Sequence, residues 1–172
     1  MMIASKPVQM RCIPRHSRGV LRQHQRSAIK TTALMVPDAY GYVMGSIGVA
    51  ALVVQWMSVK VALARRTYGV SYPAMMAEGD DEGSKTFNCI QRSHQNTLET
   101  LPTAVALQML MGLKFPITAA CMGFAWSLGR IAYAFGYSTG DPAKRMPGSA
   151  VSGIIYLALI VGTFVAGYQT VF

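Results

Sequence analysis

The sequence predicts an all-α integral membrane protein, built as a bundle of four transmembrane helices. Of its 172 residues, 52% are hydrophobic and only 13% are charged, which is about half the charged share of an ordinary soluble domain. The mean hydropathy is +0.30, and the apolar runs are long and lack the turn residues that separate strands. Such a chain has too little polar surface for a soluble monomer and is too apolar for a disordered protein.

Residues 1–37 are expected to form a basic extension ahead of a membrane domain over residues 38–172. The extension holds seven of the sixteen Lys and Arg residues, no acidic residue, and arginines that recur every three or four positions from Arg11 to Arg26. This composition is typical of an organelle transit peptide, so a mitochondrial membrane is expected, with the endoplasmic reticulum membrane or a plastid as alternatives. A basic arm lying on anionic lipid is the other interpretation of this segment.

Composition and cysteine spacing also argue against three features. Residues 1–37 contain no Phe, Trp or Tyr, whereas nucleic-acid binding needs basic residues interleaved with aromatic ones on a folded face. Cys12, Cys89 and Cys121 lie far apart and without the spacing of metal ligands. We therefore expect neither a nucleic-acid partner nor a disulfide framework nor a metal site, and expect Cys89 and Cys121 to be small apolar fillers inside helices.

The first two helices have different character. Residues 41–59 are nineteen uncharged residues, long enough at about 28 Å to cross the hydrocarbon layer. Lys60 can extend its side chain toward the interface, and Arg65 and Arg66 mark the exit from the membrane. Residues 67–85 are rich in Gly, Pro and acids and predict a polar loop. The second helix is expected from Thr86 to Leu113, polar in its first half and kinked at Pro102.

The third helix is expected from Pro116 to Tyr137, and the fourth over the uncharged residues 149–172. With four spans, the 65–85 and 138–147 loops share one face, which carries five basic residues, against Lys114 on the other face. Without the N-terminal segment, this asymmetry places the two loops on the cytoplasm-like side; with it, the rule does not choose.

Two of the expected helices carry polar side chains where lipid is expected. They share one face on each helix: Arg92, Asn96 and Glu99 on the second, and Arg130, Tyr133 and Tyr137 on the third. A charged group at the centre of a membrane helix costs about 2.5–3.5 kcal/mol, so it usually faces the bundle interior and marks function. One interpretation is that Arg92, Glu99 and Arg130 pair with one another to hold the bundle together. The surplus of basic groups toward the face that carries the 65–85 and 138–147 loops favours an anionic ligand, because arginine binds carboxylates with two donors.

Three runs of the sequence resemble the MAPEG family, the membrane-associated proteins of eicosanoid and glutathione metabolism. They are FNCIQRSHQNTLETLP (Phe87–Pro102), AWSLGRIAYAFGYSTGDPAKR (Ala125–Arg145) and ARRTYGVSYP (Ala64–Pro73). The resemblance covers about residues 40–172 and is closest to the type-3 microsomal glutathione S-transferases. It implies a homotrimer of four-helix subunits, with glutathione bound between neighbouring subunits near the cytoplasm-like face.

The resemblance also implies roles for individual residues. Arg92, Asn96 and Glu99 match glutathione-binding positions of the second helix, His94 matches a polar position, and Tyr133 and Tyr137 match the binding tyrosines of the third helix. Arg65 matches a position that contacts a carboxylate of the peptide, and Arg66 one near the electrophile. Arg130 is a further binding candidate from its place beside the tyrosines.

The residue that favours the glutathione thiolate has two candidates, because the register differs by one position from that of some relatives. In the leukotriene synthase relatives it is an arginine seven residues after the second tyrosine, whereas here the seventh residue after Tyr137 is Lys144 and the eighth is Arg145. Type-3 relatives carry the same Lys-Arg pair, so Arg145 is the candidate and Lys144 the alternative.

The implied function is a glutathione-dependent transferase or peroxidase, with glutathione as co-substrate. Its other substrate is a lipophilic electrophile or lipid hydroperoxide that arrives from the bilayer. Glutathione suits the polar residues, since its two carboxylates can bind arginines and its ammonium can bind Glu99. The alternative is a non-catalytic structural subunit of a larger organelle membrane complex, because the family also contains members that bind partners rather than catalyse.

Overall fold

The computed structural model describes residues 36–172, so the expected transit peptide lies, except for its last two positions, outside the described residues. The described chain forms four α-helices and one short 3-10 helix, with no strand among residues 36–172. The elements are α2 (Tyr40–Thr67), α3 (Glu82–Gly112), α4 (Pro116–Tyr137), η1 (Pro142–Arg145) and α5 (Met146–Val171). This confirms the all-α fold class.

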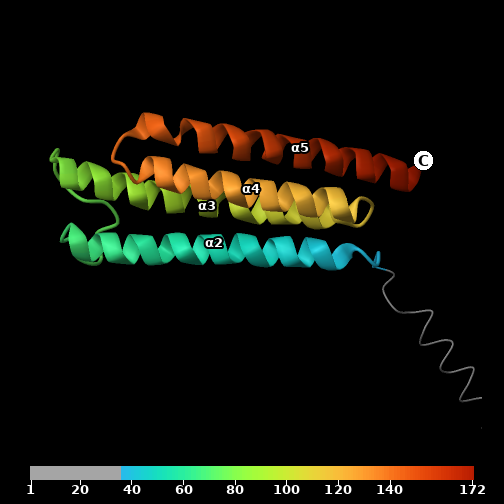
Figure 1. Ribbon diagram of the computed structural model, residues 1–172, viewed down its shortest axis with the longest axis horizontal. Coiled ribbons are helices and arrows are strands. Elements are labelled where there is room, and N and C mark those ends of the chain that lie inside the picture. Colours follow the sequence, from blue (N-terminus) through green and yellow to red (C-terminus); the bar gives the residue numbers. More distant parts are fainter. Residues whose placement is uncertain (1–35) are drawn as a thin grey trace, which may run out of the picture. The chain divides into compact units, whose positions relative to one another are not determined.

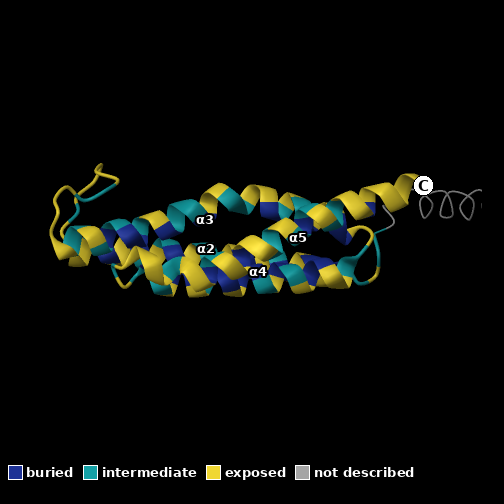
Figure 2. Cartoon of the chain, turned by 90° about the horizontal axis from the view of Figure 1, so that it is seen from above, coloured by how far each residue is buried: buried dark blue, intermediate teal, exposed yellow. Residues whose placement is uncertain are grey.

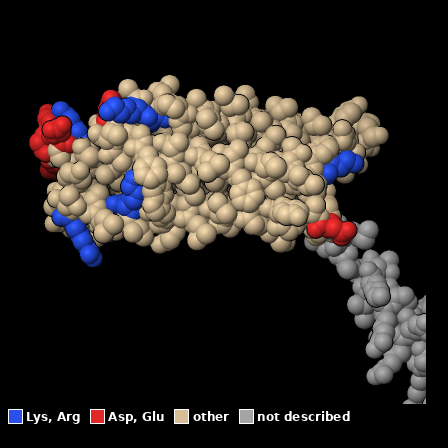
Figure 3. All heavy atoms as spheres, in the orientation of Figure 1, with Lys and Arg blue, Asp and Glu red and all other residues tan. Residues whose placement is uncertain are grey.

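The four helices lie along one axis and alternate in direction (Figure 1). α3 and α4 pack against each other and each contacts both α2 and α5, so α2 and α5 lie on opposite sides of the central pair (Figure 1). The alternation brings the α2–α3 loop and the connection through η1 to the same end of the bundle. We call this the loop end; most of the charged side chains visible in Figure 3 gather there.

The helix boundaries differ from the expected ones in physically simple ways. α2 continues past Lys60 to Thr67, because basic residues in a last helical turn, here Arg65 and Arg66, interact favourably with its free carbonyls. α3 begins at Glu82, one turn earlier than expected. Its N-cap is Asp81, whose carboxylate accepts a 2.9 Å hydrogen bond from the Ser84 backbone nitrogen. The glycines and acids that predicted a loop therefore include a helix-start signal.

Two of the described helical segments are long and apolar enough to cross a membrane by composition alone. They are α2, whose most apolar 18-residue stretch has a mean hydropathy of 1.8, and residues Pro142–Val171, which include α5 and whose most apolar stretch has 2.1. α3 and α4 lie below that level because of the polar first half of α3 and because of Arg130 in α4. Large apolar side chains nevertheless lie exposed along the bundle, for example Leu52 and Phe164 at 70% and 76% exposure (Figure 2). A lipid environment accommodates such a surface, whereas water does not.

Small residues allow the central helices to pack closely. Gln108 of α3 donates a buried hydrogen bond to the Ser46 hydroxyl of α2, and its amide fills the space beside Gly123 of α4. Close approach of this kind is typical of helices that associate in membranes. The expectation for the cysteines is half correct, since Cys89 is buried but Cys121 is exposed on the outer face of α4.

Candidate functional site

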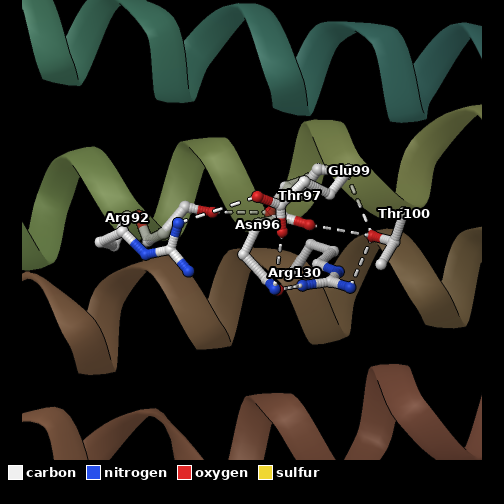
Figure 4. A network of polar contacts seen from close by, with 7 residues as sticks. Arg92, Asn96, Thr97, Glu99, Thr100 and Arg130 are labelled. Carbon is white, nitrogen blue, oxygen red and sulfur yellow. Dashed lines mark hydrogen bonds and ion pairs between the residues drawn. The ribbon is translucent and has the colours of Figure 1, made fainter. Parts of the chain in front are cut away.

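Polar side chains of α3 and α4 form one connected network, which we call the α3–α4 network: Arg92, Asn96, Glu99, Thr100 and Arg130 (Figure 4). It is centred on Arg130, which is only 6% exposed. Its guanidinium donates from Nη1 to Asn96 Oδ1 at 2.8 Å and from Nη2 to Thr100 Oγ1 at 2.7 Å. The rings of Trp126 and Tyr133 flank it, with centroids 5.2 and 5.4 Å from Cζ, a distance at which cation–π attraction operates. Among residues 36–172, both hydrogen-bond partners of this buried cation are neutral.

Arg92 and Glu99 form the outer part of the same network. Arg92 Nη1 lies 3.8 Å from Glu99 Oε1, and Asn96 Nδ2 donates to Glu99 Oε2 at 3.5 Å, which joins the pair to Arg130. Both charged side chains are about half exposed, at 46% and 49%. The pairing interpretation is therefore correct for Arg92 with Glu99 but wrong for Arg130, whose donors point to an amide and a hydroxyl. An exposed ion pair contributes at most about 1 kcal/mol, so both partners remain available to a charged ligand.

A second cluster lies one to two turns nearer the loop end. The rings of Tyr133 and Tyr137 stack with centroids 5.5 Å apart, and both are buried together with Cys89. Arg145 of η1 donates from Nη1 to the Tyr137 hydroxyl at 2.5 Å and lies 5.0 Å above the Tyr137 ring. An arginine and two phenols thus converge beside a buried thiol.

Close backbone packing holds η1 in this position. Asp141 starts the short helix by accepting a 2.9 Å hydrogen bond from the Ala143 nitrogen. The Lys144 carbonyl lies so close to Gly136 of α4 that a Cβ at Gly136 would overlap it. In this register the half-buried Arg145 side chain turns toward Tyr137, while the side chain of Lys144 is exposed.

The remaining candidates lie apart from these clusters within the single chain. Arg65 donates to the Ala74 carbonyl at 2.7 Å and stacks on the Tyr72 ring at 4.6 Å, so it braces the α2–α3 loop. Arg66 is exposed, and His94 is half-buried. Within residues 36–172, none of the three hydrogen-bonds to the α3–α4 network.

Sequence reasoning missed three members of the clusters: Thr100, Trp126 and Cys89. Thr100 lies four residues after Asn96, and Trp126 lies four residues before Arg130. Helix residues four apart are neighbours, so extending the two polar faces by one turn would have found both. Cys89 had no comparable signal, because its site forms only when the Gly140 turn packs over α3, 3.7 Å from the thiol.

Comparison with known proteins supports the resemblance at the level of the family. The model of the MAPEG family matches residues 43–165. The chain belongs to the MAPEG family. It is therefore a membrane protein, in agreement with its apolar outer surface.

Two relatives of this MAPEG protein differ in what their names say. An uncharacterized protein of Synechocystis sp. is 35% identical over 109 residues, which are 63% of this chain and 74% of the relative. Human microsomal glutathione S-transferase 2 is 31% identical over 109 residues, which are 62% of this chain and 69% of the relative. The family assignment is thus confirmed, and a glutathione S-transferase is among the relatives of this MAPEG protein.

Proposed function

We propose that this MAPEG protein is a glutathione-dependent membrane enzyme, a transferase or peroxidase acting on lipophilic electrophiles or lipid hydroperoxides. The observation that carries the proposal is the pair of adjoining clusters at the loop end, which combine three arginines with two tyrosines and Glu99. Kinship with a microsomal glutathione S-transferase supports it. The type-3 subgroup is the one that its motifs favour.

Glutathione matches the α3–α4 network in charge. Arg92 can exchange its weak pairing with Glu99 for a carboxylate of the peptide, which leaves Glu99 free to bind the ammonium. Arg130 holds Asn96 in place and adds positive charge behind the network. The ammonium and one of the two carboxylates of glutathione then each gain a partner of opposite sign.

The chemical step requires the thiolate, because the thiol is a poor nucleophile and has a pKa near 8.5 when free. Lowering that pKa by two units needs about 2.7 kcal/mol of preferential interaction with the thiolate. Arg145, held at the Tyr137 hydroxyl, is the cation that we assign to this role, and the exposed Lys144 is the alternative. With an electrophile, the sulfur forms the new C–S bond and the substrate releases a leaving group or takes up a proton. With a hydroperoxide, the sulfur takes the terminal oxygen as the O–O bond breaks, and the lipid leaves as its alcohol after taking up a proton. A second glutathione then reduces the resulting sulfenic acid, which yields the disulfide and water.

A neighbouring copy is needed to complete this site. The α3 face that bears Arg92 and Glu99 is exposed in the single chain, although in a bilayer such a polar face needs partners other than lipid. Arg65 and Arg66, expected to contact the peptide and the electrophile, lie apart from that face. Both facts support a homotrimer of four-span subunits in which α2 of one subunit supplies basic residues to the network of the next.

The test is rapid mixing of the purified protein with glutathione, following the thiolate absorbance at neutral pH. The wild type should give a thiolate signal that Arg145→Ala loses and Lys144→Ala keeps. Loss in Lys144→Ala alone would move the role to Lys144. No signal from a folded wild-type trimer would contradict the enzymatic proposal and favour the non-catalytic membrane subunit.

We also propose that residues 1–37 direct the protein to the mitochondrial membrane. The support is the acid-free, arginine-rich sequence of this segment. N-terminal sequencing of the protein from its native membrane should find the segment removed, and a start at Met1 or Met2 would contradict cleavage.

A further inference from the structure

Lys60 stands apart from the glutathione candidates and at the head of an apolar groove between α2 and α4. The groove has a volume of about 350 Å³ and is lined by Val49, Leu52, Val53, Trp56, Ile131 and Phe135. The Lys60 ammonium lies 5.0 Å from the Trp56 ring centroid and 4.9 Å from that of Phe135, the two residues at that end of the groove. The site therefore combines an apolar groove with the ammonium of Lys60.

The ammonium has unused donor capacity. Its one described hydrogen bond is to the Ser138 hydroxyl, at 2.8 Å, although an ammonium carries three donors. Among residues 36–172 the only ion pair is that between Arg92 and Glu99, so Lys60 has no carboxylate partner there. A lysine this far inside α2 is costly in a bilayer unless it reaches the interface or pairs with an anion.

The distance along α2 from the far end of the groove to Lys60 matches one leaflet of a bilayer. Lys60 follows Val49 by eleven positions in α2, a rise of about 16.5 Å, and half of the hydrocarbon core is about 15 Å thick. The groove is open to the surroundings, since Leu52 on its wall is 70% exposed. An acyl chain lying against α2 and α4 would thus bring its head group to the depth of Lys60.

We propose that this groove is a binding site for an anionic phospholipid of the surrounding bilayer, with one acyl chain in the groove and the phosphate at Lys60. The ammonium donates its free hydrogen bonds to the phosphate, while the rings of Trp56 and Phe135 hold the ammonium at the groove's head. The site uses none of the residues assigned to glutathione, so it stands or falls independently of the proposed enzyme.

Native mass spectrometry of the full chain, with equal amounts of dioleoyl-phosphatidylglycerol and dioleoyl-phosphatidylcholine, tests the site. The two lipids have the same chains, so a difference in retention reports the head group. Wild type should prefer the anionic lipid about fivefold, the equivalent of about 1 kcal/mol for one lysine near the membrane surface. Lys60→Gln should remove this preference, whereas Lys85→Gln, at an exposed lysine of the same end outside the groove, should keep it.

A second variant tests the apolar groove itself. Leu52→Trp fills the groove from its exposed wall and should lower the retention of both lipids. An unchanged anionic preference in Lys60→Gln, or unchanged retention in Leu52→Trp, would overturn the proposal. In a further sample with oleate added to the two phospholipids, retention of oleate without phosphatidylglycerol would overturn it in favour of a free fatty acid. Rapid disulfide cross-linking between copies of Leu52→Cys would overturn it in favour of a second subunit in the groove.

Discussion

At the scale of single residues, the two arginines of the α3–α4 network lie in different environments. Arg130 is almost fully buried and donates hydrogen bonds to two neutral acceptors, whereas Arg92 is half exposed and forms an ion pair with one carboxylate. Burial without a counter-charge makes Arg130 a part of the structure as well as of the site, because its neighbours lose their partners when it is removed.

Arg130→Ala is therefore expected to destabilise the protein by about 2 kcal/mol, because Asn96 and Thr100 lose their buried donors. Arg92→Ala, the matched control, should cost less than about 1 kcal/mol, since it removes an exposed ion pair. Thermal unfolding in detergent compares the two. Equal losses of stability would mean that the buried hydrogen bonds of Arg130 contribute no more than the surface pair.

Tyr137 is expected to position Arg145. Tyr137→Phe removes the hydroxyl that accepts the Arg145 hydrogen bond but keeps the ring beneath the guanidinium. The pH midpoint of the glutathione thiolate absorbance should rise by up to about one unit, the equivalent of 1.4 kcal/mol. Tyr156→Phe is the control, because the Tyr156 hydroxyl donates to Thr103 and not to a group of this cluster. An unmoved midpoint in Tyr137→Phe would show that Arg145 needs no such anchor.

At the scale of elements, the short helix η1 depends on a glycine of its neighbour. Gly136→Ala places a methyl group against the Lys144 carbonyl, a backbone atom that cannot move aside as a flexible side chain does. We expect this variant to lose the thiolate signal and some stability, because η1 and Arg145 must shift together. Gly153→Ala in α5 meets no atom within 4 Å and should leave both properties unchanged. A full thiolate signal from Gly136→Ala would exclude this control of Arg145 by packing.

The start of α3 is expected to depend on pH through Asp81. Hydrogen bonds from the Ser84 side chain and backbone lower the pKa of this exposed carboxyl. A lowered folded-state pKa contributes stability above the ordinary value of about 3.9, and this stability is lost as the pH falls through the folded value. Amide exchange in the first turn of α3 should therefore accelerate relative to the rest of the helix below about pH 4.

Two variants separate the cap from its charge. Asp81→Ala should fray the turn at every pH, while Asp81→Asn should keep the cap and lose the pH dependence, since an amide oxygen accepts the same hydrogen bond without titrating. A pH dependence that persists in Asp81→Asn would assign it to another group.

At the scale of the whole molecule, the division of basic residues between α2 and the clusters on α3, α4 and η1 predicts a shared site. Arg65→Ala and Arg145→Ala should each abolish thiolate formation when expressed alone. Trimers assembled from a mixture of the two variants should recover about one quarter of the wild-type signal, because a site between two subunits then has an intact half from each in one case of four. No recovery in mixed trimers would show that each chain holds a complete site.

The sequence by itself determined the fold class, the family and most of the network, because these depend on local patterns. Long apolar runs predict membrane helices, and residues three or four apart on a helix share a face, so Arg92, Asn96 and Glu99 could be placed together without a structure. Spacing also placed Arg130 beside the tyrosines, but it wrongly offered Glu99 as a partner for Arg130.

Only the tertiary structure decided what faces what between helices. Three features depend on how closely two helices approach and in which register. They are the hydrogen bond from Arg130 to Thr100, the turn of Arg145 toward Tyr137, and the groove beside Lys60. Those quantities follow from packing at positions such as Gly136, where the absence of a side chain lets η1 approach α4. Contacts between helices join residues far apart in the chain, and a local periodicity does not carry that information.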